Sequence, residues 1–326
     1  MIFAALRDLQ WRRRRIVIAI VGTGLVFAMS LLMSGLANSF SVEVNRTLDR
    51  QGAQAWVILA TSPGAFSPGS FLLPSDVAAI IATTGPQSTP VLYGSAVADL
   101  GRSRPADVSV MGIGEGGLAQ PNHLVEGDSL LGEGKVITPR SLGLHTGDQL
   151  SLSGRVFTVS GVVDTASVLA GLPLLQMDLA DAQGVLVGGQ PVVSTVLTTD
   201  ANPTLPAEYR TQDKPAVARG LMRPLKNAVQ SIQFVKALLW LVAALVLAAV
   251  VYLGVLDRTR DIAVFKATGA STAAVGAGVC VQAVVVAVLA AVLGVGLGVL
   301  LAPRFPMQVD IESSSMVSLP VLATAI

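Results

Sequence analysis

Residues 257–271 read DRTRDIAVFKATGAS and lie between two of the most apolar segments of the chain. Five of the first ten residues are charged, whereas only 13% of the whole chain is charged. If Leu256–Thr268 forms a helix, Gly269 can adopt the left-handed conformation that ends it, and Ser271 can cap the segment that follows. The stretch therefore predicts a short charged helix between two long apolar ones.

The flanking segments have the length of membrane spans, which need about 20 apolar residues. Three runs without a charged residue contain 22, 20 and 30 residues, and a fourth apolar run reaches the last residue. The chain is 52% hydrophobic, with a mean hydropathy of +0.65, and its charged fraction is about half that of a typical soluble domain. We expect an α-helical membrane protein with four transmembrane helices, the last truncated here, at 16–37, within 225–256, at 272–302 and from 316 to 326.

Basic residues predict the orientation of these spans, because they gather on the cytoplasmic side. Arg12–Arg15 directly precede the first span, and the first 15 residues hold five Arg against one Asp. Residues 39–232 hold 12 Lys and Arg against 16 Asp and Glu. We therefore expect a multi-pass protein of the cell membrane (the inner or plasma membrane). Residues 1–15, which we interpret as an amphipathic helix, and the charged stretch should be cytoplasmic. Residues 38–224 should be extracytoplasmic. A signal peptide cleaved after GLA (35–37) is the alternative for the N-terminus, although its apolar run would be unusually long.

The segment 38–224 mixes short strand-like runs with turn residues, which predicts a large α+β extracytoplasmic domain between the first two spans. Helices are predicted at 73–85, where Pro74 and Ser75 mark the start, and at 172–186. From Leu225 onward apolar residues recur at helical spacing, so we expect one helix over 225–256 that serves as stalk and span, and a loop at 303–315. The predicted strands are 55–59, 107–113, 135–138, 148–152, 155–163 and 192–199.

The segment offers little for catalysis or ligand chemistry. GIGEGG (112–117) has the spacing of a dinucleotide-binding loop, but no helix pattern follows it, and GEGK (132–135) lacks the spacing of a phosphate-binding loop. One cysteine and two histidines do not form a metal-ligand pattern or a nucleophile–base pair. We expect no catalytic residue, no metal, no nucleic-acid partner and no cofactor bound by this chain.

The order of residues in the charged stretch resembles the signature R-x-R-E-I-x-x-L-[KR]-A-x-G-A-S, which follows the second span in MacB/FtsX-like (type VII) permeases of ABC transporters. Asp261 stands where Glu is usual, and Phe265 where Leu is usual. Residues 126–163 are similar to the outer-domain signature of the same family. The matching residues there are Leu142, Gly143, Leu144, Gly147, Asp148, Gly154, Phe157, Val159, Gly161 and Val162.

The resemblance implies a membrane permease subunit without a fused ATPase domain. Its first expected partner is a separate ABC-type ATPase, present in two copies, which binds the ATP. Its second is another permease chain, either a second copy in a homodimer or a related permease. Membrane lipid is the third. The resemblance implies export of a hydrophobic or peptide-like substrate. The alternative is an FtsX-like transmitter that regulates an extracytoplasmic adaptor, lipoprotein or cell-wall hydrolase without transport. The residues expected to contact the ATPase are Arg258, Arg260, Asp261, Ile262, Phe265, Lys266 and Gly269.

Gly294 and Gly298 form a GxxxG pair in the third span. Such pairs allow close helix packing in membranes, including packing at the seam of a dimer. The alternative is that they only reflect the abundance of small residues in any membrane helix.

Overall fold

The computed structural model describes residues 13–67, 71–101, 105–164, 167–169, 171–257, 259–269, 271–304 and 321. The chain divides into two compact units. Unit 1 comprises 1–39 and 227–326, and unit 2 comprises 40–226. The predicted helix at 1–15 lies almost wholly outside the described residues, as does the predicted fourth span except for Val321.

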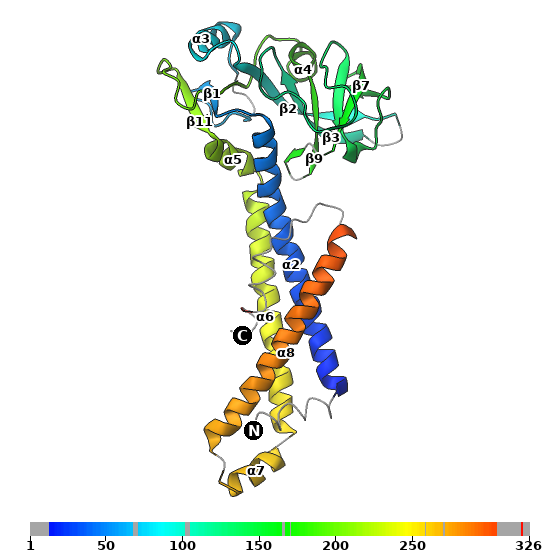
Figure 1. The fold of residues 1–326 in the computed structure, drawn as a ribbon, viewed down its shortest axis with the longest axis vertical. Helices are drawn as coiled ribbons and strands as arrows, with labels where there is room; N and C mark the ends of the chain where they lie inside the picture. The colour runs from blue at the N-terminus through cyan, green and yellow to red at the C-terminus, as the bar shows by residue number, and fades with distance from the viewer. Residues whose placement is uncertain are drawn as a thin grey trace. The chain divides into compact units, whose positions relative to one another are not determined.

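Unit 1 is helical (Figure 1). Among the described residues, three helices are long and apolar enough to cross a membrane. The third is separated from the second by a helix of nine residues. The helices are α2 (Arg13–Arg50), α6 (Lys226–Leu256), α7 (Thr259–Ala267) and α8 (Thr272–Leu301), followed by the 3₁₀ turn η2 (Ala302–Arg304).

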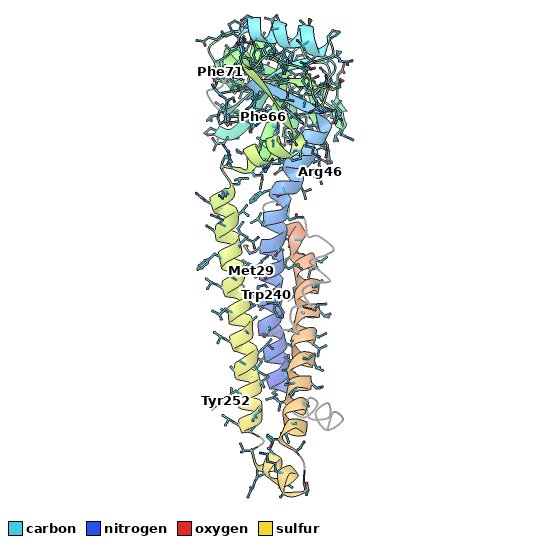
Figure 2. The ribbon with its side chains drawn as sticks, turned by 90° about the vertical axis from the view of Figure 1, so that its left-hand side faces the viewer. Met29, Arg46, Phe66, Phe71, Trp240 and Tyr252 are labelled. Carbon is cyan, nitrogen blue, oxygen red and sulfur yellow. The ribbon has the colours of Figure 1, made fainter. Side chains whose placement is uncertain are left out.

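The core of unit 1 is an apolar cluster formed by α2, α6 and α8. Small residues dominate the contribution of α8, including Ala287, Ala290 and Ala291. Trp240 of α6 is labelled in Figure 2. Its ring packs against that of Phe27 of α2, with the ring centroids 5.4 Å apart. The three helices therefore form one packed bundle through side chains of α2.

Unit 2 is built on a mixed β-sheet with helices packed against it (Figure 1). Besides the end of α2, the described residues form α3 (Pro74–Thr84), η1 (Arg140–Leu142), α4 (Leu179–Leu186) and α5 (Lys214–Met222). Its strands are β1 (Ala55–Leu59), β2 (Thr89–Asp99), β3 (Pro105–Ile113), β4 (Leu124–Gly127), β5 (Lys135–Pro139), β6 (Gln149–Leu152), β7 (Arg155–Val163), β8 (Ser167–Leu169), β9 (Leu172–Asp178), β10 (Thr195–Thr198) and β11 (Tyr209–Asp213).

Part of this sheet closes on itself. The strands pair in the order β2, β3, β9, β5, β7, β6 and back to β2, and the β3–β9 and β5–β7 pairs are parallel. Strand β2 is long enough to pair with β10 through residues 89–91 and with β6 through residues 98–99. It therefore joins the closed ring to the open extension β10, β1 and β11.

Helices cover both faces of the sheet because its strands alternate apolar residues between two cores. Val91 and Met111 face a core completed by the end of α2 and by α5. Leu92 and Val110 face the inside of the ring, where α4 adds two buried residues. Helix α3 packs on the extension through Ile80.

The predicted strands and the helix at 73–85 are confirmed at most positions, but the helix at 172–186 is wrong. Residues 172–178 form strand β9, and only 179–186 are helical. The apolar run of β9 lies between β3 and β5, where a strand needs no polar face, and such a run cannot be distinguished from a helix by periodicity. Asp178 ends the strand and caps α4, because its carboxylate accepts a hydrogen bond from the Ala180 N–H at 2.9 Å.

Candidate functional site

The charged stretch forms helix α7, which stands between the two membrane-length helices α6 and α8. Its last turn is closed by Gly269, which has a φ of +96° and donates its N–H to the Lys266 carbonyl at 3.1 Å. Ser271 directly precedes α8, and its carbonyl accepts the Val275 N–H at 3.2 Å. The predicted helix and its glycine stop are therefore present, shorter at the N-terminal end than expected.

The side chains of α7 expose both charge and apolar surface. Arg260 and Lys266 are exposed, whereas Ile262 is half-buried. Val264 is 61% exposed although it is apolar. It follows Arg260 by four residues, so the two lie on the same face of the helix. Sequence reasoning missed Val264, and its spacing from Arg260 was the available signal.

Three of the predicted contact residues cannot be placed. Arg258 lies outside the described residues. Asp261 and Phe265 belong to α7 by their backbone, but their side chains lie outside the described part of the structure.

The glycines of the third span lie against α2 of the same chain. A Cβ atom added to Gly294 would stand 2.7 Å from the Phe27 Cβ atom and 2.9 Å from the Gly24 carbonyl oxygen. One added to Gly298 would stand 2.9 Å from a methyl carbon of Leu31. Real Cβ atoms do not approach a backbone so closely, so only glycine at position 294 allows this contact between α2 and α8, whereas at Gly298 the nearest atom ends a flexible side chain.

The partner surface on α2 combines a glycine with two large side chains, namely Gly24, Phe27 and Leu31. A Cβ atom added to Gly24 would stand 3.0 Å from a methyl carbon of Leu293 and 3.1 Å from the Ala290 carbonyl oxygen. The contacts advance along both helices in the same direction, from Gly24 near Ala290 to Leu31 near Gly298, so the helices are parallel. The GxxxG face is thus occupied within one chain.

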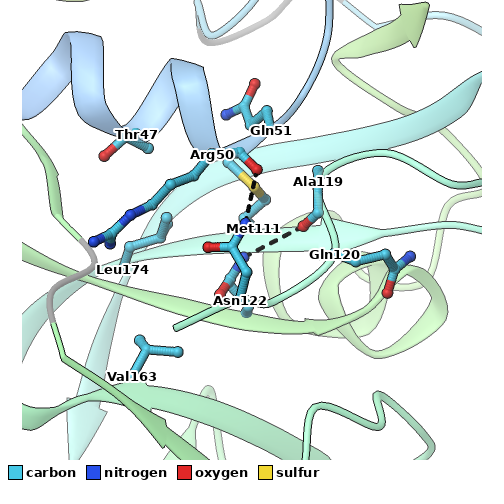
Figure 3. A pocket seen from close by; sticks show the side chains of 10 residues that line it. Thr47, Arg50, Gln51, Met111, Ala119, Gln120, Asn122, Val163 and Leu174 are labelled. Carbon is cyan, nitrogen blue, oxygen red and sulfur yellow. Dashed lines mark hydrogen bonds between the residues drawn. The ribbon is translucent and has the colours of Figure 1, made fainter. Parts of the chain in front are cut away.

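The C-terminal end of α2 borders a small cavity in unit 2 of about 30 Å³ (Figure 3). Its lining combines Arg50, the last residue of α2, and the following Gln51 with Gln120 and Asn122 of the loop after β3 and with apolar residues such as Met111. Burial and the nearby charge of Arg46 lower the pKa of Arg50, while Asp164 opposes this shift. The volume holds one or two water molecules, so the cavity as described does not fit a whole organic ligand.

The GIGEGG stretch has a packing role. An added Cβ atom on Gly112 would stand 2.3 Å from the Ala182 Cβ atom, and one on Gly116 would stand 2.1 Å from the Thr89 hydroxyl oxygen. No helix follows the stretch. These glycines therefore let the end of β3 approach α4 and β2, which accounts for them without a phosphate ligand.

The family-like stretch 126–163 forms β4 to β7, three of whose strands belong to the closed ring. Gly143, Gly147 and Gly154 have φ between +66° and +92°, a region that favours glycine. Phe157 and Val159 are buried inside the ring. The signature thus specifies the scaffold. Among the described residues, no group of three His, Cys, Asp or Glu side chains could hold a metal.

Comparison with known proteins identifies the family. The sequence pattern of the family described as FtsX-like permease C-terminal matches residues 234–326. A Mycobacterium tuberculosis protein named Uncharacterized ABC transporter permease Rv2563 is 41% identical over 327 residues, covering 100% of this chain and 93% of the relative. The chain belongs to the FtsX-like ABC transporter permeases.

Other proteins are similar to this permease. A second Mycobacterium tuberculosis protein, Uncharacterized ABC transporter permease Rv0072, is 39% identical with the same coverage. The periplasmic region of MacB from Actinobacillus actinomycetemcomitans has a TM-score of 0.38 at 15% identity, covering 55% of this chain and 98% of that structure. The extracellular domain of YknZ from Gram-positive bacteria has a TM-score of 0.35 at 15% identity, covering 44% and 82%.

The family match includes all of α7 and α8. This permease is therefore a membrane protein with an α+β domain inserted between its first two long helices. Both the charged helix and the glycine face lie in the part of the chain that defines the family.

Proposed function

We propose that this permease couples ATP hydrolysis by a separate ATPase subunit to movement of its α+β domain, and that this movement expels a hydrophobic or peptide-like substrate from the membrane. The observation that supports the proposal most directly is helix α7. It is short, exposed and positively charged, and it connects two membrane-length helices. An ABC transporter permease in general requires an ATPase partner.

The surface of α7 suits a protein partner. Arg260 and Lys266 offer charge that can pair with acidic groups, and Val264 offers an apolar side chain that water covers poorly. Complementary charge around an apolar contact is typical of specific interfaces. We therefore assign α7 as the docking element for the ATPase, with ATP bound by that partner.

The charge distribution supports the orientation that this role requires. Arg13–Arg15 begin α2, and α7 carries the next group of basic residues near a membrane-length helix. By the positive-inside rule both lie in the cytoplasm, where ATP is available, and unit 2 lies outside the membrane. We further propose a fourth span from residue 316 and an assembly of two permease chains with two ATPase chains.

Co-purification tests the docking assignment. The permease is expressed with a candidate ATPase from a neighbouring gene, and recovery of the ATPase is measured for Arg260→Ala, Val264→Asp and Phe265→Asp. We expect at least a ten-fold loss for the double variant Arg260→Ala, Val264→Asp, because it removes a charge pair and places a carboxylate in an apolar contact.

The matched control is Arg304→Ala. Arg304 is an exposed arginine in η2, at the other end of α8 from α7. It should leave the recovery of the ATPase unchanged. Equal recovery with the wild type and the double variant would remove the docking assignment.

An FtsX-like transmitter, which switches an extracytoplasmic partner and moves no substrate, is the second candidate. The match of residues 234–326 to the family described as FtsX-like permease C-terminal supports this candidate. ATPase turnover of the reconstituted pair, measured with lipids, peptides and cell-wall hydrolases, separates the two. Stimulation by lipids or peptides supports export, and stimulation by a protein partner alone supports transmission.

A further inference from the structure

Helix α2 does not end at the edge of unit 2 but forms part of its core. Val44 and Leu48, on its last two turns, are 1% exposed and pack with Trp56 of β1 and with Val217 and Leu221 of α5. The helix runs from Arg13 to Arg50 without interruption. Its last part is therefore an internal element of the domain that is also continuous with the membrane unit.

Hydrogen bonds from unit 2 hold the C-terminal turn of α2. The Asn122 side-chain amide donates to the Arg50 carbonyl at 3.1 Å (Figure 3), and the Ala119 N–H donates to the Gln51 carbonyl at 2.9 Å. The Trp56 indole N–H donates to the Gln51 side-chain oxygen at 3.0 Å. The last carbonyls of a helix lack partners within it, so these donors fix the end of α2 in the domain.

Side chains on the flank of α2 add two further attachments. Asp49 forms an ion pair with Lys214 at the start of α5, with 2.6 Å between the charged atoms. Glu43 accepts the Gly171 N–H at 3.2 Å, next to strand β9. The helix is thereby tied to elements from three separate parts of the chain.

The loop that supplies Ala119 and Asn122 is held in an unusual conformation. Ala119 has a φ of +59° and His123 a φ of +58°, values that cost energy for residues with a side chain. The loop is pinned to β2 by the Leu118 N–H, which donates to the Thr89 hydroxyl at 3.0 Å. Surrounding contacts must therefore maintain this conformation, and it presents both donors to α2.

The second connection of unit 2 is held differently. Between α5 and α6, residues 223–225 form a turn with local hydrogen bonds: the Arg223 N–H donates to the Gly220 carbonyl at 3.2 Å, and the Leu225 N–H donates to the Met222 carbonyl at 3.1 Å. Arg223 and Pro224 are exposed. Residues 223–225 therefore join α5 to α6 by a turn and not by a continuous helix.

We propose that α2 is the drive element of this permease and that residues 223–225 are a hinge. The loop 114–123, which we call the clamp, binds the end of α2 by hydrogen bonds. Movement of α2 is therefore transmitted to the sheet through the clamp. The turn before α6 changes its backbone conformation to allow this movement. The proposal rests on the proposed function, since it names the path by which that function would act.

Hydrogen exchange of the full chain in lipid nanodiscs tests the clamp without a partner. Asn122→Ala removes one donor from the Arg50 carbonyl, and exchange of the amides of residues 48–51 and 119–123 should rise about five-fold, the effect of one hydrogen bond. Asn202→Ala, at an exposed asparagine after β10, is the matched control and should change neither segment. Unchanged exchange in Asn122→Ala, or an equal rise throughout unit 2, would overturn the clamp.

Insertion of two glycines tests the drive and the hinge in the complex with the ATPase. The readout is the ATP-dependent change in exchange of the loop 114–123, with co-purification as the check that the complex forms. Insertion after Arg223 should preserve the ATP response, whereas insertion after Ser41, within α2, should abolish it.

The outcomes separate this inference from the proposed function. If the wild-type permease does not bind the ATPase, the proposed function fails. If the wild-type permease binds the ATPase, three results would contradict the drive and hinge assignment and leave the proposed function intact. The loop 114–123 does not respond to ATP, both insertions keep the response, or only the insertion after Arg223 loses the response.

Discussion

Helices α2 and α6 have nearly equal hydropathy in their most apolar windows but different surroundings. Their most apolar windows have mean hydropathies of 2.5 and 2.7, yet 50% of the window is buried within the chain for α2 and only 11% for α6. Helix α2 packs against α8 in unit 1 and ends inside the core of unit 2. Hydropathy identifies a membrane-length helix, but it does not show whether lipid or protein covers it.

The difference follows from the size of the side chains at the contacts. Where α2 meets α8, glycines on both helices let the backbones approach closely. On α6, the buried contribution is limited to Ala243 and Leu247, and large side chains such as Leu245 point away. A helix surface of large apolar side chains can pack against lipid or another subunit as well as against other helices of this chain.

The largest effect is expected where α2 ends in unit 2. Leu48→Ala removes a fully buried side chain and should lower the free energy of unfolding of unit 2 by about 2–5 kcal/mol. Leu245→Ala on α6, at a side chain that is 61% exposed, should change it by less than about 0.5 kcal/mol. Urea unfolding of the full chain in detergent, followed by tryptophan fluorescence, measures both. Equal effects would mean that the end of α2 is not part of the core.

A smaller effect is expected at the glycine face of α8. Gly294→Ala places a methyl group against the backbone of α2, which cannot move aside cheaply, and should destabilise the bundle by about 1–3 kcal/mol. Gly296→Ala is the matched control, because no atom lies within 4 Å of an added Cβ atom there. Unfolding in mixed SDS micelles, followed by helicity, compares the two. A larger loss for Gly296→Ala would place the tight contact on the opposite face.

The smallest effect is expected at Tyr209, on the strand that leads to α5 and α6. Its hydroxyl donates to the Asp76 carboxylate at 2.8 Å, and this hydrogen bond, more than burial, raises the pKa of Tyr209 to about 12. Because the unfolded value is about 10, the stabilisation is complete below pH 10 and is lost as the pH rises to about 12.

Tyr209→Phe should remove this part of the pH dependence, measured as the stability difference between wild type and variant from pH 9 to 12. The difference should be small, since Tyr209 is only partly buried and solvent weakens the interaction. Burial of the half-buried Tyr93 also raises the pKa of its hydroxyl, but this contribution is equal in both proteins and cancels in the difference. A constant difference across this range would contradict the role of the Asp76 bond.

The sequence predicts local features well where one residue has one physical role. Gly269 ends α7 with a positive φ, as its position indicates, and Pro74 and Asp76 start α3. The apolar run of α6 and its polar beginning form one continuous helix, as their periodicity predicts. These features depend on neighbours in the chain, so the chain order is sufficient.

Features that depend on distant segments were not accessible in the same way. The apolar run of β9 resembles a helix until β3 and β5 flank it. The extension of α2 to Arg50 depends on a core to which α5 contributes, more than 150 residues later. The apolar exposure of Val264 becomes visible only when the neighbours of α7 are known.

Residue order alone predicts the membrane-length helices, the charged helix between two of them and the family, because hydropathy, charge and motif order are properties of consecutive residues. How these parts pack against one another follows only from the three-dimensional structure. It shows the GxxxG face against α2, the GIGEGG stretch as a packing loop and the end of α2 capped by Ala119 and Asn122. Those assignments rest on distances of a few ångströms between segments far apart in the chain, which side-chain packing sets and residue order does not.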